Sequence, residues 1–349
     1  MSEGWQTFAP YLKAQARGPA NLGELDPDFS EEAMDLILAG VASPVQTSGF
    51  LLVGRARTES FSEIAAYARA TQRFVRSIEP AVGDPVVTVA GSFDGKVRTF
   101  NVGAAASLVA AAAGGRVLMI GGQGVPPKFG HTIFDSLNRL GVDAPQTLDE
   151  AEDSLRDRSF AATTPQHYLP ELHGMLQLRR EMVRRTALNV VEKIISPISA
   201  SPMMIGVTHR PFLETIPKAL IELSTDRALV YQAIEGPDEA PLDGNSSLVR
   251  VRYGEIEEFT ISPESLGLSR ATKAHIPWTG PIDEARALRS ALEGNDGPVK
   301  DLILYNAALR LWMLDDGIPL ENCMERARET LGSNTTSSLA SGLREAVPA

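Results

Sequence analysis

Apolar residues in the first 80 positions recur at the spacing of amphipathic helices, and no stretch before Pro80 alternates as a half-buried strand would. Two acids follow Ser30 directly, which predicts that Ser30 caps a helix with the sequence AMDLILAG. Ser60 and Glu63 have the spacing of a capping box, so another helix is expected to begin there. With the apolar segment QTSGFLLVGRAR between them, the pattern predicts a small all-helical N-terminal domain over residues 1–80.

From Pro85 onwards, short β-rich runs alternate with helical segments. VVTVAG and RVLMIGG are strand-like and rich in glycine at their ends, and an alanine-rich segment, 104–113, lies between them. MMIGVTH, RALVYQAI and SLVRVRY repeat the pattern, with FLETIPKALIEL between the first two. Such alternation predicts an α/β fold with a mostly parallel central sheet that helices cover on both faces. The larger α/β domain is expected over residues 81–335.

Three further segments complete the predicted organisation. Residues 151–185 are helical and charged in character, and we expect them to pack back on the N-terminal helices and complete the helical domain. VKDLILYNAALRLWML and LENCMERARETL predict a C-terminal helix pair. SNTTSSLASG begins a polar segment that is expected to be a mobile surface tail, with residues 336–349 outside the folded domain.

Composition and charge narrow the location and the partners. The N-terminus lacks the layout of a secretory signal, and no apolar run is long enough to span a bilayer, so a cytoplasmic protein without membrane contact is expected. The single cysteine, Cys323, excludes an intramolecular disulfide. A formal net charge of −11 disfavours nucleic acid unless a local basic patch exists, but it does not exclude a small phosphorylated substrate.

The order of motifs resembles the anthranilate phosphoribosyltransferase family over about residues 30–335. The segments that carry the resemblance are GFLLVGRARTESFSEIAAYARA, DGKVRTFNVGAAASLVAAAAGGRV, GVPPKFG, RREMVRRTALNVVEKIISP, GPDEA and GPVKDLILYNAALRL. The resemblance implies a helical domain joined to an α/β domain, with the site in the cleft between them. It also implies a homodimer through the N-terminal helices and a phosphorylated small molecule, 5-phosphoribosyl diphosphate, as the donor substrate.

Several residues match the family's donor-binding positions. They lie in the turn after the first strand and in a second loop: Asp94, Gly95, Thr99, Asn101, Gly121 and Lys128. One residue is inserted before Thr99 relative to the family pattern.

The same loops also depart from the family pattern. Phe93 stands within a turn where the family has a pair of glycines, and Gly103 replaces a serine that contacts metal and phosphate. The family's two phosphate-binding serines are Pro126 and Pro127 here. Because Phe and Pro remove both donors and space, the sequence predicts that diphosphate is not bound in the family's way. The family's contacts to anthranilate are also missing, which predicts another acceptor.

Asp238 and Glu239 are adjacent carboxylates at the position of the family's acidic metal pair. Mg²⁺ prefers oxygen ligands and often bridges carboxylates to substrate phosphates, so Mg²⁺ is a possible cofactor. The alternative is a polar surface turn, since Gly-Pro precedes the pair and Ala-Pro follows it.

Arg179 matches the arginine that contacts the acceptor's carboxylate in the family, and a guanidinium suits that role. The alternative is a solvated helix face, supported by the i,i+4 spacing of Glu181 and Arg185. A lone histidine, His131, follows the second loop. We expect it either to have a structural role or to line the pocket.

Two functional hypotheses follow. In the first, the chain is a phosphoribosyltransferase-like, Mg-dependent enzyme with an acceptor other than anthranilate. In the second, it is a non-catalytic relative whose cleft binds nucleic acid or another polyanion. The second is favoured by NVVEKIISP, which resembles a divergent branch of the family, and by four arginines that could form a basic groove with Lys128 and Lys193.

Overall fold

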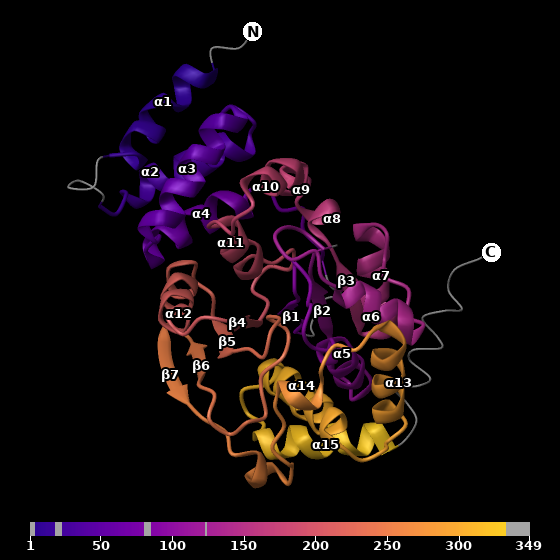
Figure 1. The fold of residues 1–349 in the computed structure, drawn as a ribbon. Coiled ribbons are helices and arrows are strands. Elements are labelled where there is room, and N and C mark those ends of the chain that lie inside the picture. The colour runs from indigo at the N-terminus through magenta and orange to yellow at the C-terminus, as the bar shows by residue number, and fades with distance from the viewer. Residues whose placement is uncertain (1–3, 18–22, 80–84, 123, 333–349) are drawn as a thin grey trace.

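The computed structural model describes residues 4–17, 23–79, 85–122 and 124–332. The N-terminal part is all-helical, as predicted, and forms the indigo bundle of Figure 1. Its helices are α1 (Gly4–Gln15), α2 (Pro27–Leu38), α3 (Pro44–Arg57) and α4 (Phe61–Gln72). The predicted C-terminal tail, including SNTTSSLASG, lies outside the described residues.

One of the two predicted helix caps is confirmed. Ser60 caps α4 in a complete capping box, in which its side chain accepts from the Glu63 N–H and Glu63 accepts from the Ser60 N–H. The prediction for Ser30 is wrong, because α2 begins at Pro27 and its N-cap is Asp26, four residues before Ser30. Proline at the first helical position and an aspartate before it are the stronger start signal.

A seven-stranded sheet forms the centre of the larger domain, in the order β3-β2-β1-β4-β5-β6-β7. Its strands are β1 (Val87–Ala90), β2 (Val117–Ile120), β3 (Phe160–Thr163), β4 (Met203–Val207), β5 (Arg227–Gln232), β6 (Leu248–Arg252) and β7 (Glu255–Phe259). The first five are parallel, and β6 and β7 are antiparallel, so the mostly parallel sheet is confirmed. The strands β3 and β7 were not predicted.

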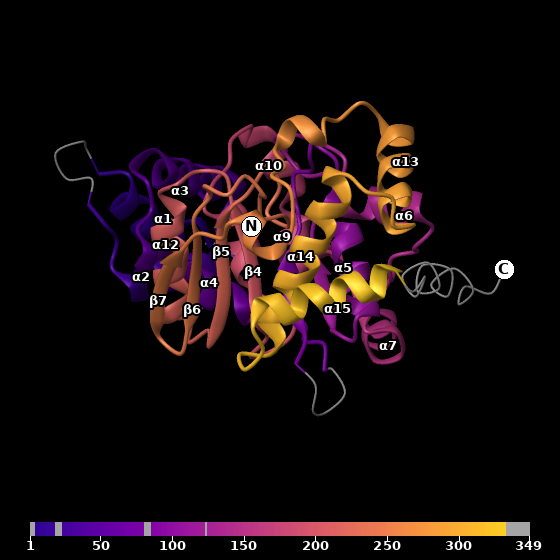
Figure 2. The ribbon, with the colours of Figure 1, turned by 90° about the horizontal axis from the view of Figure 1, so that it is seen from below.

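Helices cover both faces of this sheet (Figures 1 and 2). The helices that follow β1 in the chain are α5 (Val102–Ala112), α6 (Ile133–Leu140), α7 (Leu148–Arg158), α8 (Pro165–Tyr168), α9 (Pro170–Gly174), α10 (Leu176–Met182), α11 (Leu188–Ile194), α12 (Phe212–Glu222), α13 (Pro281–Leu292), α14 (Pro298–Leu314) and α15 (Leu320–Gly332). The predicted C-terminal helix pair is thereby confirmed, and Cys323 is buried within it. Two short 3₁₀ helices, Pro263–Leu266 and Lys273–His275, connect β7 to α13.

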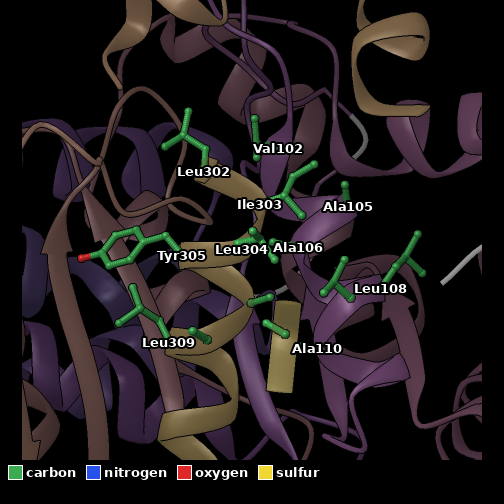
Figure 3. Packing of buried hydrophobic residues seen from close by; sticks show 14 of the residues in the cluster. Val102, Ala105, Ala106, Leu108, Ala110, Leu302, Ile303, Leu304, Tyr305 and Leu309 are labelled. Atoms are coloured by element: carbon green, nitrogen blue, oxygen red, sulfur yellow. The ribbon is translucent and has the colours of Figure 1, made fainter. Parts of the chain in front are cut away.

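Alternate residues of the central strands enter two separate hydrophobic cores. On β4, Met203 and Ile205 pack with the core that continues into the N-terminal bundle, whereas Met204 packs with the core beneath α5 and α14. Figure 3 shows the second core, in which alanines of α5 such as Ala106 allow Ile303 and Leu304 of α14 to approach closely. Burial on both faces explains why these strands read as continuous apolar runs.

The helical bundle is joined to the α/β domain by direct contacts. Helix α4 packs against α11 and α12, and α10 contacts α3. Backbone hydrogen bonds connect Arg76 N–H to Tyr168 O at 2.8 Å and Ile78 N–H to Pro197 O at 2.8 Å. In the segment 151–185, α7 and β3 lie in the sheet layers, while α10 reaches the bundle. No helix in the described part of the chain combines the length and the apolarity needed to cross a membrane.

Candidate functional site

The predicted site residues gather where parallel strands end. The chain runs outward from β1 to β2 and β3 and then returns to β4 on the other side of β1, so a topological switch point lies between β1 and β4. Ligands of open α/β sheets bind at such a point, beyond the carboxyl ends of the strands. The loop 91–101 follows β1, the loop 121–132 follows β2, and the loop 233–247 follows β5.

At the centre of this region, a lysine lies on the predicted metal pair. Lys96 Nζ is 2.5 Å from Glu239 Oε1 and 3.9 Å from Asp238 Oδ1. All three side chains are 0% exposed. The alternative interpretation of Asp238 and Glu239 as a polar surface turn is therefore wrong. Both carboxylates are buried, and the cation beside them comes from the chain itself.

Two further groups hold the acidic pair in place. The N–H of Gly103, in the first turn of α5, donates to Glu239 Oε1 at 2.9 Å, where the helix dipole favours negative charge. A Cβ atom at position 103 would overlap the Asp238 carboxylate, so the glycine is needed for this close approach. The guanidinium of Arg310, on α14, donates to the backbone oxygen of Asp238 at 2.9 Å. Lys96 and Arg310 thus place two buried cations next to the two carboxylates.

Burial and charge act against each other in this cluster. Burial alone would lower the pKa of Lys96, but the charges of Asp238 and Glu239 outweigh it and raise the pKa above its ordinary value. Burial raises the pKa of Glu239 to about 7, although Lys96 opposes the rise. The lysine is therefore a cation, and the acidic pair depends on it for neutralisation.

A third carboxylate, Glu235, occupies a cradle of backbone N–H groups. It accepts from the N–H of Val97 at 3.1 Å and from those of Arg98 and Thr99 at 2.9 Å each. The Thr99 hydroxyl donates to it at 3.0 Å, and Lys128 Nζ lies 3.3 Å away. Consecutive N–H groups with a lysine form an anion site. Burial would raise the pKa of Glu235, but the Val97 N–H and Lys128 outweigh it and lower the pKa.

The two predicted donor loops are closed on each other. Lys96 and His131 form an antiparallel bridge, and the Val125 N–H donates to the Phe93 carbonyl at 3.0 Å. Phe93 is buried, and its backbone lies where a Cβ atom at Gly122 would stand. Among the described residues of the two loops, these contacts leave no open turn of the kind that surrounds a diphosphate.

Replacing Gly95 by alanine is expected to destabilise the closed loops by about 2 kcal/mol or more, because position 95 has a left-handed backbone and a Cβ atom would overlap the Gly130 carbonyl. Gly40→Ala is the matched control, since Gly40 has a similar φ of 71° but nothing within 4 Å of a Cβ atom. It should cost only about 1 kcal/mol. Urea unfolding of both variants checks the difference, and equal losses would contradict the closed-loop packing.

Arg179 is also satisfied from within the chain. Its guanidinium forms two hydrogen bonds to the Glu192 carboxylate, at 2.7 and 2.9 Å, and the arginine is 4% exposed. The alternative of a solvated helix face is wrong for Arg179. Helix α10 ends at Met182, so Arg185 lies beyond it and pairs with Asp94 and not with Glu181.

A cavity of about 150 Å³ lies beside this ion pair, between the two loops and helices α8–α10. Its walls include Phe93, Val125, Leu172, Arg179 and Glu192. A cavity of about 150 Å³ holds a group the size of benzene, whereas sites for larger ligands take about 300–1,000 Å³. The space is sufficient for a small ring but not for phosphoribosyl diphosphate.

The remaining predicted residues take other roles. Gly121 directly follows β2 and packs under Ile133. Asn101 is buried, where its N–H donates to Glu284 at 2.8 Å and its amide donates to Ser136 at 3.2 Å. His131 stacks on Trp278 with ring centroids 3.6 Å apart. The structure therefore groups Thr99 and Lys128 around Glu235, and Asp238 and Glu239 around Lys96, with Asp94, Gly95 and Arg179 at the edges.

Sequence reasoning missed Lys96, Glu235, Glu192 and Arg310 as members of the site. Signals existed for two of them. Lys96 lies in the stretch that carries the inserted residue, and Glu192 is part of the Glu-Lys deviation. Glu235 directly precedes Gly236, but no spacing rule connects it to the N–H groups of residues 97–99. Arg310 comes from a helix more than 200 residues away from Ser107, to which it donates.

The donor set of the acidic pair has the chemistry that Mg²⁺ prefers. Both Asp238 oxygens and Glu239 Oε2 are buried and accept no hydrogen bond from the residues that the structure describes. However, Lys96 already supplies a positive charge there. Within the described ranges, no group of three or more His, Cys, Asp or Glu side chains could hold a metal ion, so the two carboxylates form only a partial set of ligands.

Comparison with known proteins adds a family context. The chain matches the model of a glycosyl transferase family, with the helical bundle domain over residues 9–75 and the α/β domain over residues 87–336. The anthranilate phosphoribosyltransferase of Thermomicrobium roseum is 30% identical over 312 residues, which cover 88% of this chain and 89% of that protein. The enzyme of Legionella pneumophila (strain Corby) is 28% identical over 321 residues, or 92% of both chains.

Solved structures give the same picture. Anthranilate phosphoribosyltransferase from Thermus thermophilus superposes with a TM-score of 0.81 and 26% identity, over 97% of this chain and 98% of that one. The enzyme from Saccharomyces cerevisiae, solved in complex with PRPP and Mg, superposes with a TM-score of 0.81 over 99% and 98% of the two chains. Its identity is 19%, so that likeness concerns the fold.

Proposed function

The chain belongs to the anthranilate phosphoribosyltransferase family of glycosyl transferases, and from that premise we propose that its cleft binds a phosphorylated ligand of the phosphoribosyl diphosphate type and does not use anthranilate as acceptor. The single observation that carries the proposal is that the chain's own side chains pair with the groups that would bind a substrate's charges. The carboxylate of Glu235 occupies the N–H cradle, and that of Glu192 holds Arg179.

The surroundings of Arg179, where the family's acceptor is expected, support the exclusion of anthranilate. A bidentate carboxylate on Arg179 uses the two hydrogen bonds that an acceptor's carboxylate would need. The neighbouring cavity of about 150 Å³ still accommodates a small ring. An acceptor without a carboxylate fits this arrangement better than one with it.

Binding of the donor's phosphate at the N–H cradle would require the Glu235 carboxylate to move away. Thr99, Lys128 and the N–H groups of residues 97–99 have the chemistry to bind a phosphate once that carboxylate moves away. Asp238 and Glu239 would hold Mg²⁺, the possible cofactor, which would neutralise the charge of a leaving diphosphate. The yeast relative is solved with PRPP and Mg, which supports this part of the proposal. The residues of this chain would bind and orient the donor.

Calorimetric titration of phosphoribosyl diphosphate into the protein, with and without Mg²⁺, tests the proposal. Binding that is lost in Asp238→Asn/Glu239→Gln would support it, and the same titration with anthranilate should give no heat. Absence of binding at about millimolar donor, an affinity of only about 4 kcal/mol, would contradict the donor-binding function.

Replacing Glu235 by alanine is expected to raise the affinity for inorganic diphosphate about tenfold or more, because it frees three N–H donors and Lys128. Calorimetry on the wild-type and variant proteins measures the change. Glu214→Ala is the control, since that carboxylate is exposed and pairs only with Lys218 on the same helix. Unchanged affinity in Glu235→Ala would mean that the cradle is not an anion site.

The second candidate, binding of nucleic acid or another polyanion without catalysis, is favoured by one observation. Arg180 and Arg184 are exposed next to the closed loops, with Arg180 over the ring of Phe129. Their neighbours Lys128 and Arg185 are paired with carboxylates, which reduces the positive field. Binding of a single-stranded DNA oligonucleotide that weakens steeply with salt, and is lost in Arg180→Ala/Arg184→Ala, would support this candidate.

We further propose a homodimer through the N-terminal helices. Trp5 on α1 and Val45 on α3 are both exposed, and a hydrogen bond of 2.7 Å from Gln46 to the Trp5 carbonyl holds the two helices together. Light scattering on Trp5→Lys/Val45→Lys should show a smaller mass than the wild-type protein. Cytoplasmic location is likewise a proposal, which cell fractionation tests.

A further inference from the structure

We propose that Lys96 is a built-in cation that takes the place of a divalent metal ion at Asp238 and Glu239, so that the protein binds no metal there in the absence of an anionic ligand. The primary observation is the position of Nζ, which lies 2.5 Å from one carboxylate and 3.9 Å from the other in a fully buried site. The inference concerns the protein alone and stands whether or not the cleft binds phosphoribosyl diphosphate.

The backbone around Lys96 is built to hold the ammonium there. Two backbone hydrogen bonds join Lys96 to His131. The Lys96 N–H donates to the His131 carbonyl at 2.8 Å, and the His131 N–H donates to the Lys96 carbonyl at 2.9 Å. Nζ also donates to the Phe100 carbonyl at 3.2 Å. Because the backbone is fixed at one end and the ammonium at the other, the side chain cannot leave the pair without breaking these contacts.

Charge balance gives the second argument. Asp238 and Glu239 carry at most two negative charges, and Lys96 and Arg310 carry two positive ones, all four side chains being fully buried. Buried charges are tolerated only when they are paired, and the two cations already offset the carboxylates without a metal. A divalent ion added to it would leave at least two uncompensated positive charges. It could enter only after the lysine is removed, or together with a ligand that brings negative charge.

Space gives the third argument. A metal ion on the pair would need room for further oxygen ligands, since Mg²⁺ takes six. The Asp238 carboxylate instead lies against Gly103, where even a Cβ atom would overlap it. Gly236 is also constrained, because a Cβ atom there would approach the Lys96 side chain. In the protein without a ligand, the space that remains beside the two carboxylates therefore fits the Lys96 ammonium.

The test is binding of Mn²⁺, used as a paramagnetic probe and followed by electron paramagnetic resonance in the absence of any substrate. The wild-type protein should leave the signal of free Mn²⁺ unchanged, whereas Lys96→Met should bind Mn²⁺ at least about tenfold more tightly. Lys128→Met is the matched control, because this neighbouring lysine pairs with Glu235 and not with the acidic pair. It should behave as the wild-type protein does.

Adding Asp238→Asn/Glu239→Gln to Lys96→Met should abolish the gained binding. Wild-type binding of Mn²⁺ that is lost in Asp238→Asn would overturn the inference, and so would a folded Lys96→Met protein that binds no Mn²⁺. If Lys96→Met folds only when divalent cations are present, that dependence supports the inference, since a metal then replaces the missing ammonium. If Lys96→Met does not fold under any condition, the titration of the wild-type protein with Mn²⁺ decides: no binding supports the inference, and binding at the acidic pair overturns it.

Discussion

Replacing Glu192 by alanine is expected to lower the free energy of unfolding by about 3–5 kcal/mol. The carboxylate makes both hydrogen bonds of a buried, bidentate pair with Arg179, so its removal leaves a guanidinium charge without a partner. The loss should therefore exceed what a surface carboxylate contributes. Urea unfolding monitored by circular dichroism measures it, with an unchanged slope as the sign that only stability changed.

Glu214→Ala is the control for this prediction, because Glu214 and Lys218 form an exposed i,i+4 pair that should contribute only about 0.5 kcal/mol or less. The double variant Arg179→Met/Glu192→Leu should be more stable than Glu192→Ala, since it removes both buried charges together. A loss in Glu192→Ala no greater than in Glu214→Ala would show that the pair is not buried in solution.

The same variant also tests what Arg179 recognises. With Glu192 removed, the guanidinium borders a cavity of about 150 Å³, which accommodates a ring with a carboxylate. Benzoate or anthranilate should then raise the melting temperature of Glu192→Ala but not that of the wild-type protein. An equal effect on both proteins would contradict the view that Glu192 excludes carboxylate ligands from this cavity.

These internal pairs share one physical cause. A substrate site in this fold gathers charged side chains and N–H groups at the carboxyl ends of the strands, and such groups are costly when buried without partners. In this chain Lys96, Glu235 and Glu192 supply the partners from within. The arrangement makes the closed cleft stable by itself, and a ligand must compete with these side chains in order to bind.

The fold was largely readable from the sequence because its strongest signals are local. Short apolar runs that alternate with helical segments predicted β1, β2, β4, β5 and β6, and the Ser60 capping box predicted the start of α4. The missed strand β7 has the sequence EIEEF and is mostly exposed, so it lacks an apolar run. The missed strand β3 directly follows the charged helix α7 and lies in the segment 151–185, which was expected to be helical.

The site was less readable because its decisive contacts join distant residues. Adjacent carboxylates were recognisable at Asp238 and Glu239, but not the lysine that lies more than 100 residues earlier and neutralises them. Glu235 reaches the N–H groups of residues 97–99 only through the folding of two separate loops. Side-chain pairing across loops follows no period, so it becomes visible only in three dimensions.

Arg310→Met is expected to destabilise the protein by about 3–5 kcal/mol and to disturb the acidic pair as well. The guanidinium is fully buried and donates to Ser107 Oγ at 2.9 Å, to the Asn306 carbonyl at 2.8 Å and to the Asp238 carbonyl at 2.9 Å. It thereby connects α5, α14 and the loop after β5. Urea unfolding, followed by both circular dichroism and tryptophan fluorescence, measures the loss.

Arg156→Met is the matched control, since Arg156 is half exposed on α7 and pairs only with nearby aspartates. It should change stability by less than about 1 kcal/mol. If Arg310→Met behaved like this control, the guanidinium would not be a buried counter-charge. The view that two buried cations offset the two carboxylates would then be wrong. If the loss is large and a second substitution, Asp238→Asn, partly reverses it, the two residues are coupled through charge. Removing one charge of each sign would then restore the balance.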